Sequence, residues 1–240
     1  MKFKKDKINI IVPIAKIDIN FHREFRNFKY YSKLGKQKII LDYAKKVFDK
    51  FNLKFDIEIY FITSEKIQKK YNIKHYIDKV KYKKNTIILK KETKNLIETF
   101  LHSKLLINNK NEKIIIYHPD SFCEIDIAKF YTLSQKKFDG IQFGYDHFNP
   151  TDHLSSDTGR FSVTKNQKIK KIYEKTKLDN HLLTCAGLHY FKNWYLFEHY
   201  AQKLLISKKI VHKVTSEVYN LMLINNLHIK YFEVTDFISF

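Results

Sequence analysis

The sequence predicts an α/β fold, in which a mostly parallel sheet is covered by helices on both faces in a doubly wound, three-layer arrangement. Segments of strand length alternate with amphipathic segments through about the first 137 residues, as expected where crossover helices connect parallel strands. The first such strand, Ile8–Ala15 (INIIVPIA), is apolar along its length. An apolar run of this kind is typical of a central strand buried on both faces.

The alternation continues after this strand. Apolar residues at helical spacing predict a helix over residues 36–51 (KQKIILDYAKKVFDKF). Its expected apolar stripe consists of Ile39, Ile40, Tyr43, Val47, Phe48 and Phe51. The next expected elements are strands at Phe55–Thr63 and Thr86–Leu89, a helix at Thr93–Ile107 and a strand at Lys113–His118.

After about residue 138 the strands become shorter, which predicts a mixed or antiparallel extension of the same sheet. The expected strands are 138–145, 159–164, 168–175, 185–191 and 228–234, and the expected helices are 194–206 and 216–226. The segment Asp146–Gly159 is the one long polar loop. We expect a single domain over residues 1–240, because this length is within the range of one α/β unit.

The composition is strongly basic, with 45 Lys and Arg residues against 25 acids and a formal charge of +20. The isoelectric point near 9.6 would ordinarily indicate a polyanionic partner. The lysines, however, are spread along the whole chain among Ile, Asn, Tyr and Phe, and no zinc-finger spacing or RNP sequence occurs. This pattern favours the codon bias of an AT-rich genome and leaves nucleic-acid binding as the lesser alternative.

Cysteine use and hydropathy indicate the compartment. Cys123 and Cys185 form neither a CxxC motif nor a disulfide framework, which favours a reducing cytosol. The N-terminus imitates a signal peptide, but Asn9 and Pro13 interrupt its apolar run. No apolar run reaches the ~18 residues that a membrane span needs. We therefore expect a soluble cytoplasmic protein whose basic surface is able to rest against a membrane.

A carboxylate stands where the predicted strand Lys113–His118 ends. Asp120 follows almost at once, and Glu124 and Asp126 come within six further residues. Because ligands of open α/β sheets bind beyond the carboxyl ends of the strands, Asp120 is a candidate Mg²⁺ ligand. The alternative is that it caps the following helix. Asp236, after the last predicted strand, is a candidate second ligand or an ordinary loop acid.

Six stretches are similar in order and spacing to motifs of one enzyme family. They are INIIVPIA, LGKQKIILDYAKKVF, TKNLIETFLHSKLLI, IIIYHPDSFCEID, KIYEKTKLDNHLLTCAGLHYFKN and SEVYNLMLINNLHIKYFEVTDF. Together they resemble the sugar-phosphate nucleotidyltransferases, and are closest to bacterial cytidylyltransferases that modify capsules and surface polysaccharides. The resemblance covers nearly the whole chain. It implies a GT-A-like, Rossmann-like fold with a nucleotide half of about 1–137 and an acceptor half of about 138–240.

This resemblance also implies a reaction and its residues. The reaction is Mg²⁺-dependent transfer of a nucleotidyl group, CMP favoured, from a nucleoside triphosphate to a phosphorylated small molecule. By resemblance Asp120 and Lys175 are catalytic, and Asp120 and Asp236 hold the metal. The implied acceptor contacts are Glu174, Gly187 and Glu217. The implied nucleotide contacts are Ala15, Lys16, Arg23, Arg26, Lys29 and Thr99.

Each of these assignments has a structural alternative. Lys175 is one lysine of many and could be solvated, and Gly187 could mark a strand bulge. The family's glycine-rich phosphate loop is absent, since no glycine occurs in residues 15–33. Either cationic side chains replace the backbone contacts that glycine allows, or the protein is a noncatalytic descendant that binds a nucleotide, a phosphorylated ligand or a partner enzyme.

Overall fold

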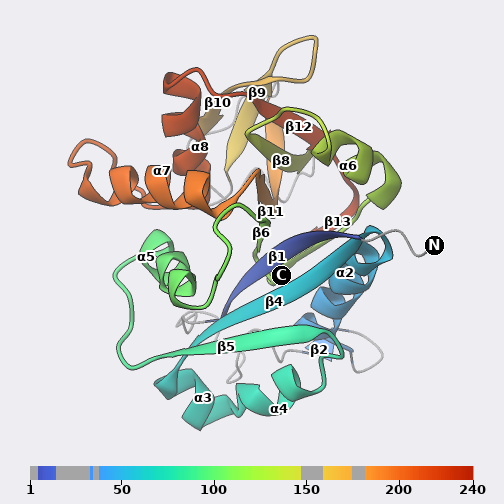
Figure 1. Cartoon of the computed structure of the whole chain (residues 1–240), viewed down its shortest axis with the longest axis vertical. Helices are drawn as coiled ribbons and strands as arrows, with labels where there is room; N and C mark the ends of the chain where they lie inside the picture. The colour runs from blue at the N-terminus through green and yellow to red at the C-terminus, as the bar shows by residue number, and fades with distance from the viewer. Residues whose placement is uncertain (1–4, 15–32, 35–37, 147–158, 175–181, 240) are drawn as a thin grey trace.

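A nine-stranded mixed sheet forms the centre of the molecule (Figure 1). The structure is a computed structural model of the whole chain, and it describes residues 5–14, 33–34, 38–146, 159–174 and 182–239. The first half contributes four parallel strands in the spatial order β6-β1-β4-β5. They are β1 (Asp6–Ile14), β4 (Phe55–Ser64), β5 (Lys83–Leu89) and β6 (Lys113–Tyr117).

The second half extends this sheet with mixed pairing, as the shorter strands predict. The long strand β11 runs antiparallel to both β6 and β8, and β12 runs parallel to β8. At the other end of β11, the antiparallel pair β9 and β10 forms an edge of the sheet. These strands are β8 (Gly140–Tyr145), β9 (Arg160–Val163), β10 (Ile169–Tyr173), β11 (Leu183–Phe191) and β12 (Ile229–Glu233).

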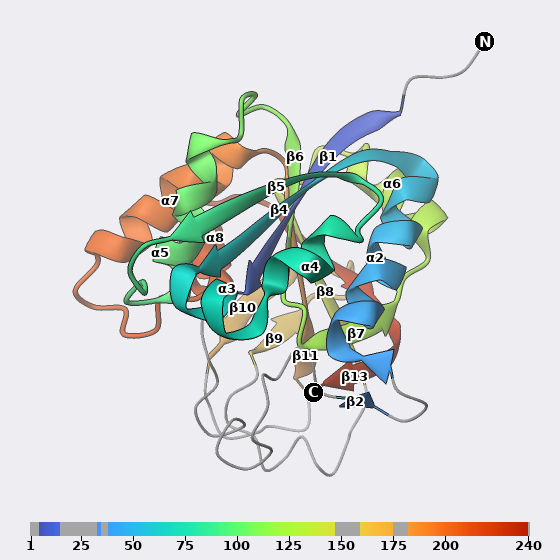
Figure 2. The same cartoon turned by 90° about the horizontal axis from the view of Figure 1, so that it is seen from below.

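Helices cover both faces of the sheet, which gives the three-layer arrangement that the sequence predicts (Figure 2). Alternate residues of β1 point to opposite faces, so Ile10 joins one hydrophobic core and Ile11 the other. The Ile10 core includes α2 (Ile40–Lys54), α3 (Glu65–Tyr71), α4 (Ile73–Asp78) and α6 (Ile127–Ser134). The Ile11 core includes α5 (Leu96–Leu101), α7 (Trp194–Ile206) and α8 (Thr215–Ile224).

Helix boundaries differ from the expectations where polar side chains fix the ends. The helix expected from Thr93 begins at Leu96, because the side chain of Asn95 accepts a hydrogen bond from the Glu98 amide at 2.9 Å. It continues as the 3₁₀ turn η2 (His102–Leu105). Ile39, expected on the helical stripe of residues 36–51, instead ends β3 (Lys38–Ile39), which pairs with β2 (Lys33–Leu34).

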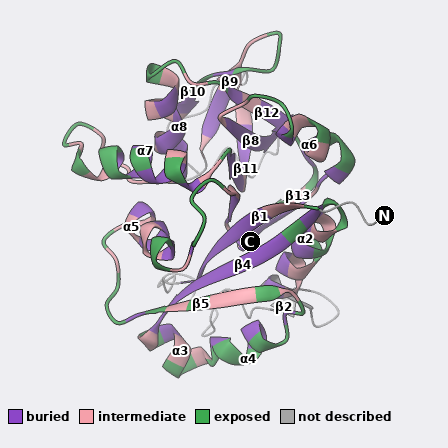
Figure 3. Cartoon of the chain, viewed as in Figure 1, coloured by how far each residue is buried: buried purple, intermediate pink, exposed green. Residues whose placement is uncertain are grey.

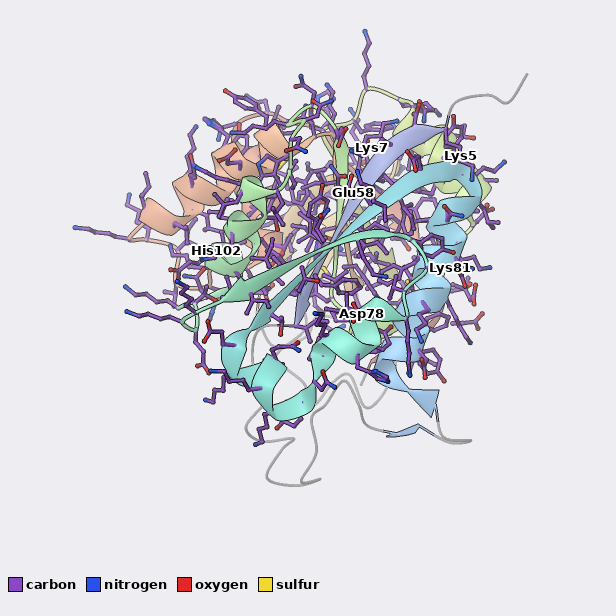
Figure 4. All side chains as sticks on the ribbon, turned by 60° about the horizontal axis from the view of Figure 1, so that its bottom comes forward. Lys5, Lys7, Glu58, Asp78, Lys81 and His102 are labelled. Atoms are coloured by element: carbon purple, nitrogen blue, oxygen red, sulfur yellow. The ribbon has the colours of Figure 1, made fainter. Side chains whose placement is uncertain are left out.

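The two central strands are buried along most of their length (Figure 3), yet Glu58 lies within β4. Lys7 and Lys83 reach its carboxylate at 3.0 and 2.9 Å, and Figure 4 shows Lys7 and Glu58 on neighbouring strands. Burial would raise the pKa of Glu58, but hydrogen bonds from Lys83, Lys7 and Asn85 outweigh burial and lower it to about 2. Lys7 is near the amino end of β1. These ion pairs therefore link β1, β4 and β5 at the end of the sheet opposite the carboxyl ends of the strands.

Within the described residues, no helix is both long and apolar enough to cross a lipid bilayer.

Candidate active site

The chain turns sharply after β6, and Asp120 lies in that turn. The element that follows Asp120 is β7 (Ser121–Glu124), a strand that the sequence pattern does not reveal. The next helix, α6, is capped by Asp126, whose Oδ1 accepts hydrogen bonds from the amides of Ala128 and Lys129 at 3.1 and 3.0 Å. The capping alternative for Asp120 is therefore wrong, and the cap is a different carboxylate of the same stretch.

Hydrogen bonds fix the Asp120 turn against β11. The His118 amide donates to the carbonyl of Gly187 at 2.9 Å. The Ser121 hydroxyl is within 3.1 Å of the His118 carbonyl and 3.2 Å of the Ala186 carbonyl. The two strands that flank Asp120 are thus tied to the same short segment of β11, which limits how far the carboxylate can move.

Gly187 makes this close approach possible. Its φ of +69° is in the left-handed region, and the register of β11 against β8 shifts between Cys185 and His189. A Cβ at this position would lie 2.2 Å from the Oγ of Ser121. Gly187 thus lies in an irregular stretch of β11, as a bulge would produce, and Ser121 approaches its backbone. The acceptor contact of Gly187 stays a prediction.

Asp236 lies on β13 (Thr235–Ser239), a second strand that the sequence pattern does not reveal. β13 runs antiparallel to β7, so Ser239 pairs with Ser121 beside Asp120, whereas Thr235, next to Asp236, pairs with Glu124 at the other end of β7. The pairing is irregular between Thr235 and Ile238, and Asp236, at φ +49°, lies in this irregularity. A non-glycine residue in this conformation is uncommon and is found disproportionately at functional sites. The two candidate metal ligands are therefore carried by the β6–β7 turn and by the strand paired with β7.

The acceptor-side residues lie on the neighbouring strands. Glu174 directly follows β10, and its Oε2 accepts a hydrogen bond from the Ser216 hydroxyl at 2.6 Å. A Cβ built on Gly159 would lie 2.9 Å from that oxygen and 3.3 Å from the Sγ of Cys185. Glu174 therefore lies near Cys185 of β11, which is two residues along the chain from Gly187.

Glu217 lies on α8, where its Oε2 accepts a hydrogen bond from the side-chain nitrogen Nδ2 of Asn220 at 3.0 Å. It lines a groove between β10 and α8 together with Glu174. Asn220 also bonds to both the amide and the carbonyl of Ile172, which ties α8 to the edge strand β10. The acceptor assignment of Glu174 and Glu217 stays a prediction, and the structure gives them neighbouring positions.

The nucleotide side of the site is described only in part. Ala15, Lys16, Arg23, Arg26 and Lys29, and Lys175 on the acceptor side, lie outside the described residues. Thr99 is described and buried in α5, where its hydroxyl contacts the Asn95 carbonyl at 3.2 Å and the hydroxyl of Thr93. Its nucleotide contact stays a prediction. Because the hydroxyl is already bonded, we expect Thr99 to act by shaping the segment before α5.

Sequence reasoning missed Arg160, at the start of β9. It is 4% exposed, and its guanidinium donates a hydrogen bond to the hydroxyl of Thr184. Burial raises the pKa of the Cys185 thiol, the charge of Glu174 raises it further, and that of Arg160 opposes the rise. Arg160 is therefore close enough to this group to influence it electrostatically. The sequence feature that could have identified Arg160 is its residue type, because almost every other basic residue of the chain is a lysine.

A pair of histidine rings packs beneath the Asp120 turn. The rings of His118 and His189 are 5.5 Å apart, and Nδ1 of His189 is 2.8 Å from the Gln142 side-chain oxygen. The amide nitrogen of Gln142 donates to the Phe143 carbonyl at 2.7 Å, so the Gln142 oxygen is left to accept and His189 carries its proton on Nδ1. Burial lowers the pKa of both rings, strongly for His189, while the charge of Asp120 opposes the lowering at His118.

This pair predicts a loss of stability in mild acid. Because the folded pKa of His189 is below that of the unfolded chain, its contribution is complete above pH ~6.5 and falls as the pH drops through that value. The free energy of unfolding falls by about 1.4 kcal/mol per pH unit for each proton that is taken up only on unfolding. Urea unfolding of His189→Gln between pH 7 and 5 should show a shallower slope than wild type. Exposed His228, changed to Gln, is the control, and equal slopes in the wild type and His189→Gln would contradict the prediction.

Comparisons with known proteins address the fold directly. No family model and no curated relative matches the chain. Among solved structures, the nucleoside-diphosphate-sugar pyrophosphorylase from Vibrio cholerae RC9 superposes with a TM-score of 0.73 at 15% identity, covering 96% of this chain and 94% of that one. The inositol-1-phosphate CTP transferase from T. maritima gives 0.70 at 12% identity, over 98% and 89%. This chain has the nucleotidyltransferase fold.

A UDP-glucose pyrophosphorylase in complex with UDP-glucose is also similar, with a TM-score of 0.70 at 15% identity over 96% of this chain and 91% of that one. The similarities span nearly the whole chain, as the six sequence stretches do. They confirm the resemblance, and with it the mostly parallel α/β fold, at the level of architecture. Within a nucleotidyltransferase fold, Asp120 and Gly187 occupy the carboxyl side of the central strands, where open α/β sheets bind their ligands.

Proposed function

We propose that this protein is a cytoplasmic nucleotidyltransferase that transfers a nucleotidyl group, CMP favoured, from a nucleoside triphosphate to a phosphorylated small molecule used in capsule or surface polysaccharide modification. The observation that carries the proposal is the junction of β6, β7, β11 and β13 around Asp120. It places a candidate metal ligand beside a glycine bulge and next to the strand that bears Asp236. The fold similarity to a CTP transferase and to sugar-nucleotide pyrophosphorylases supports the same class of reaction.

The donor set suits Mg²⁺. Among the described residues, no group of three or more His, Cys, Asp or Glu side chains is arranged to hold a metal ion. Mg²⁺ in nucleotide enzymes commonly takes one or two carboxylates and completes its shell with substrate phosphates and water. Asp120 and Asp236 would supply the two carboxylates. When bound, the ion would neutralise the phosphate charge that accumulates during transfer.

The reaction itself needs orientation rather than a covalent intermediate. A phosphate oxygen of the acceptor attacks the α-phosphorus of the nucleotide, the α–β anhydride bond breaks, and pyrophosphate leaves with its electron pair. The residues of the chain would bind and align the two substrates. We assign acceptor positioning to Glu174, Lys175 and Gly187, and also to Glu217, which lines the same groove as Glu174. Arg23, Arg26 and Lys29 would bind the triphosphate through side chains, since glycine is absent there.

A pyrophosphate-release assay tests this proposal. The full-length protein is incubated with Mg²⁺ and each of the four nucleoside triphosphates, in combination with sugar phosphates, phosphocholine, inositol phosphate or phosphorylated amino acids. We expect release with at least one pair, fastest with CTP, and none without acceptor or after chelation of the metal. Absence of release with every pair would contradict the enzymatic proposal for these substrates.

The glycine-free segment of residues 15–33 favours a second candidate, a noncatalytic protein that retains the fold and binds a nucleotide or a phosphorylated ligand. Titration calorimetry separates the two. Nucleotide binding that needs Mg²⁺ and that is lost in Asp120→Ala supports the enzyme. Binding that is indifferent to both, together with no turnover, supports the binding protein.

A further inference from the structure

Three large aliphatic side chains are almost fully exposed where α7 ends and α8 ends. Ile206 and Val211 are each 81% exposed, and Ile224 is 75% exposed. Ile224 also lines the groove of about 570 Å³ between α8 and β10, together with Ile210. Ile206 and Val211 lie outside the groove lining, on the same connection as Ile210. An apolar groove with further exposed aliphatic residues close by in the chain is a candidate interaction site. We call this surface, made of residues 206–211, the end of α8 and the outer side of β10, the α7–α8 tip (Figure 1).

The aliphatic residues at the tip are not needed for the core. On the same helices, Leu204, Val218 and Met222 are fully buried and form the contacts with the sheet. The connection between α7 and α8 is also held in place, because the ammonium of Lys213 donates to the carbonyls of Leu204 and Ser207 at 2.7 and 2.6 Å. The tip therefore presents its apolar side chains on a fixed framework.

Lysines surround these apolar groups. Exposed Lys208 and Lys209 lie between Ile206 and Ile210, and exposed Lys170 and Lys171 line the groove from β10. Residues 199–216 contain no Asp or Glu. The two acids that do line the groove are already engaged, Glu217 by Asn220 and Glu174 by Ser216.

We infer that the α7–α8 tip docks on an anionic lipid surface, with the aliphatic side chains in the headgroup boundary and the lysines against lipid phosphates. Apolar groups ringed by Lys are the composition of interfacial membrane contacts. A second copy of the chain is disfavoured, because its own lysine ring would meet this one. Protein-binding hot spots are typically rich in Trp, Tyr and Arg, and among the described residues that line the groove only Tyr173 is of these types. The inference rests on exposed residues of this surface, and its groove is also lined by Glu174 and Glu217, the proposed acceptor residues.

Vesicle flotation with the full-length protein tests the inference. Vesicles of phosphatidylcholine alone are compared with vesicles containing phosphatidylglycerol, at low and at high salt. We expect binding to the anionic vesicles at low salt and little binding to the neutral ones. Each lysine near an anionic surface strengthens binding about fivefold. The double variant Lys208→Gln/Lys209→Gln and the triple variant Ile206→Ser/Val211→Ser/Ile224→Ser should each lose about tenfold or more.

Matched controls separate the tip from the general basic surface. Lys90→Gln/Lys91→Gln removes two exposed lysines after β5, and Leu53→Ser/Leu105→Ser removes two exposed leucines from α2 and η2. Both should bind as the wild type does, and thermal melting confirms that all four variants fold. The inference is overturned by absence of binding at low salt, by tip variants that bind like the wild type, by control variants that lose as much as the tip variants, or by retention on immobilised polyglutamate without binding to vesicles.

Discussion

Replacing Asp120 by Asn is expected to abolish Mg²⁺-dependent nucleotide binding and to reduce turnover on the order of 10²-fold or more, while the protein still melts within a few degrees of wild type. Hard divalent cations depend on anionic oxygen ligands, and the substitution removes the charge while keeping the shape of the side chain. The helix that follows Asp120 in the described part of the chain is capped by Asp126, so the change leaves that cap intact. Calorimetry with Mg²⁺ and CTP, and thermal melting in metal-free buffer, measure the two effects.

The same stretch contains a matched control for this variant. Asp126 caps α6 through two amide hydrogen bonds, and Asn caps helices about as well as Asp. Asp126→Asn should therefore change neither metal binding nor melting, and Asp126→Ala should cost about 1 kcal/mol of stability with metal binding intact. Mg²⁺ and nucleotide binding equal to wild type in Asp120→Asn would show that this acid only ends a strand.

Gly187→Ala is expected to impair both stability and turnover. The added methyl group would meet the Ser121 Oγ at 2.2 Å, and the left-handed φ of +69° disfavours any side chain. We expect a loss of roughly 1–3 kcal/mol of unfolding free energy. Turnover should fall further than the folded fraction, because relieving the contact moves the Ser121 hydroxyl, which ties the turn that carries Asp120 to β11. Urea unfolding and pyrophosphate release by the folded protein measure these losses.

A second substitution separates geometry from stability. Ser121→Gly in the Gly187→Ala background removes the opposing side chain, so turnover should recover in part while the backbone strain remains. Gly140→Ala is the control, because its methyl group would press on Tyr219, 2.7 Å away, on the helix-covered side of β8. It should destabilise the protein without reducing the activity of folded molecules. Wild-type melting and turnover in Gly187→Ala would contradict the predicted role of the bulge.

The sequence predicted a helix or strand correctly where the hydrophobic pattern of that segment alone identifies it. The expected helix of residues 194–206 has the bounds of α7, and the apolar run after Ile8 is the central strand β1. The predictions for these two segments are correct because a single hydrophobic pattern runs along the whole segment. The helix over residues 36–51 starts later than expected, at Ile40, because β3 uses Lys38 and Ile39.

The candidate site was predicted less completely, because its geometry depends on distant pairing. β7 has only four residues, and its partner β13 comes near residue 240, so neither strand has a local pattern that identifies it. Without β7, Asp120 is the acid that could cap the following helix, and the residue that does cap it, Asp126, is not recognised. Arg160 was missed for a similar reason, because its burial depends on its contact with Thr184 of β11.

The pairing of β7 with β13 also bears on the order in which the protein folds. Asp120 and Asp236 are separated by most of the second half of the sequence, and β7 and β13 form a two-stranded sheet outside the main one. Contacts between residues so far apart carry a large loop-closure cost and tend to form late. The local free energy of opening β13 can therefore be much smaller than that of global unfolding. Such an opening would release the strand that bears Asp236 from β7 while the nine-stranded sheet stays folded.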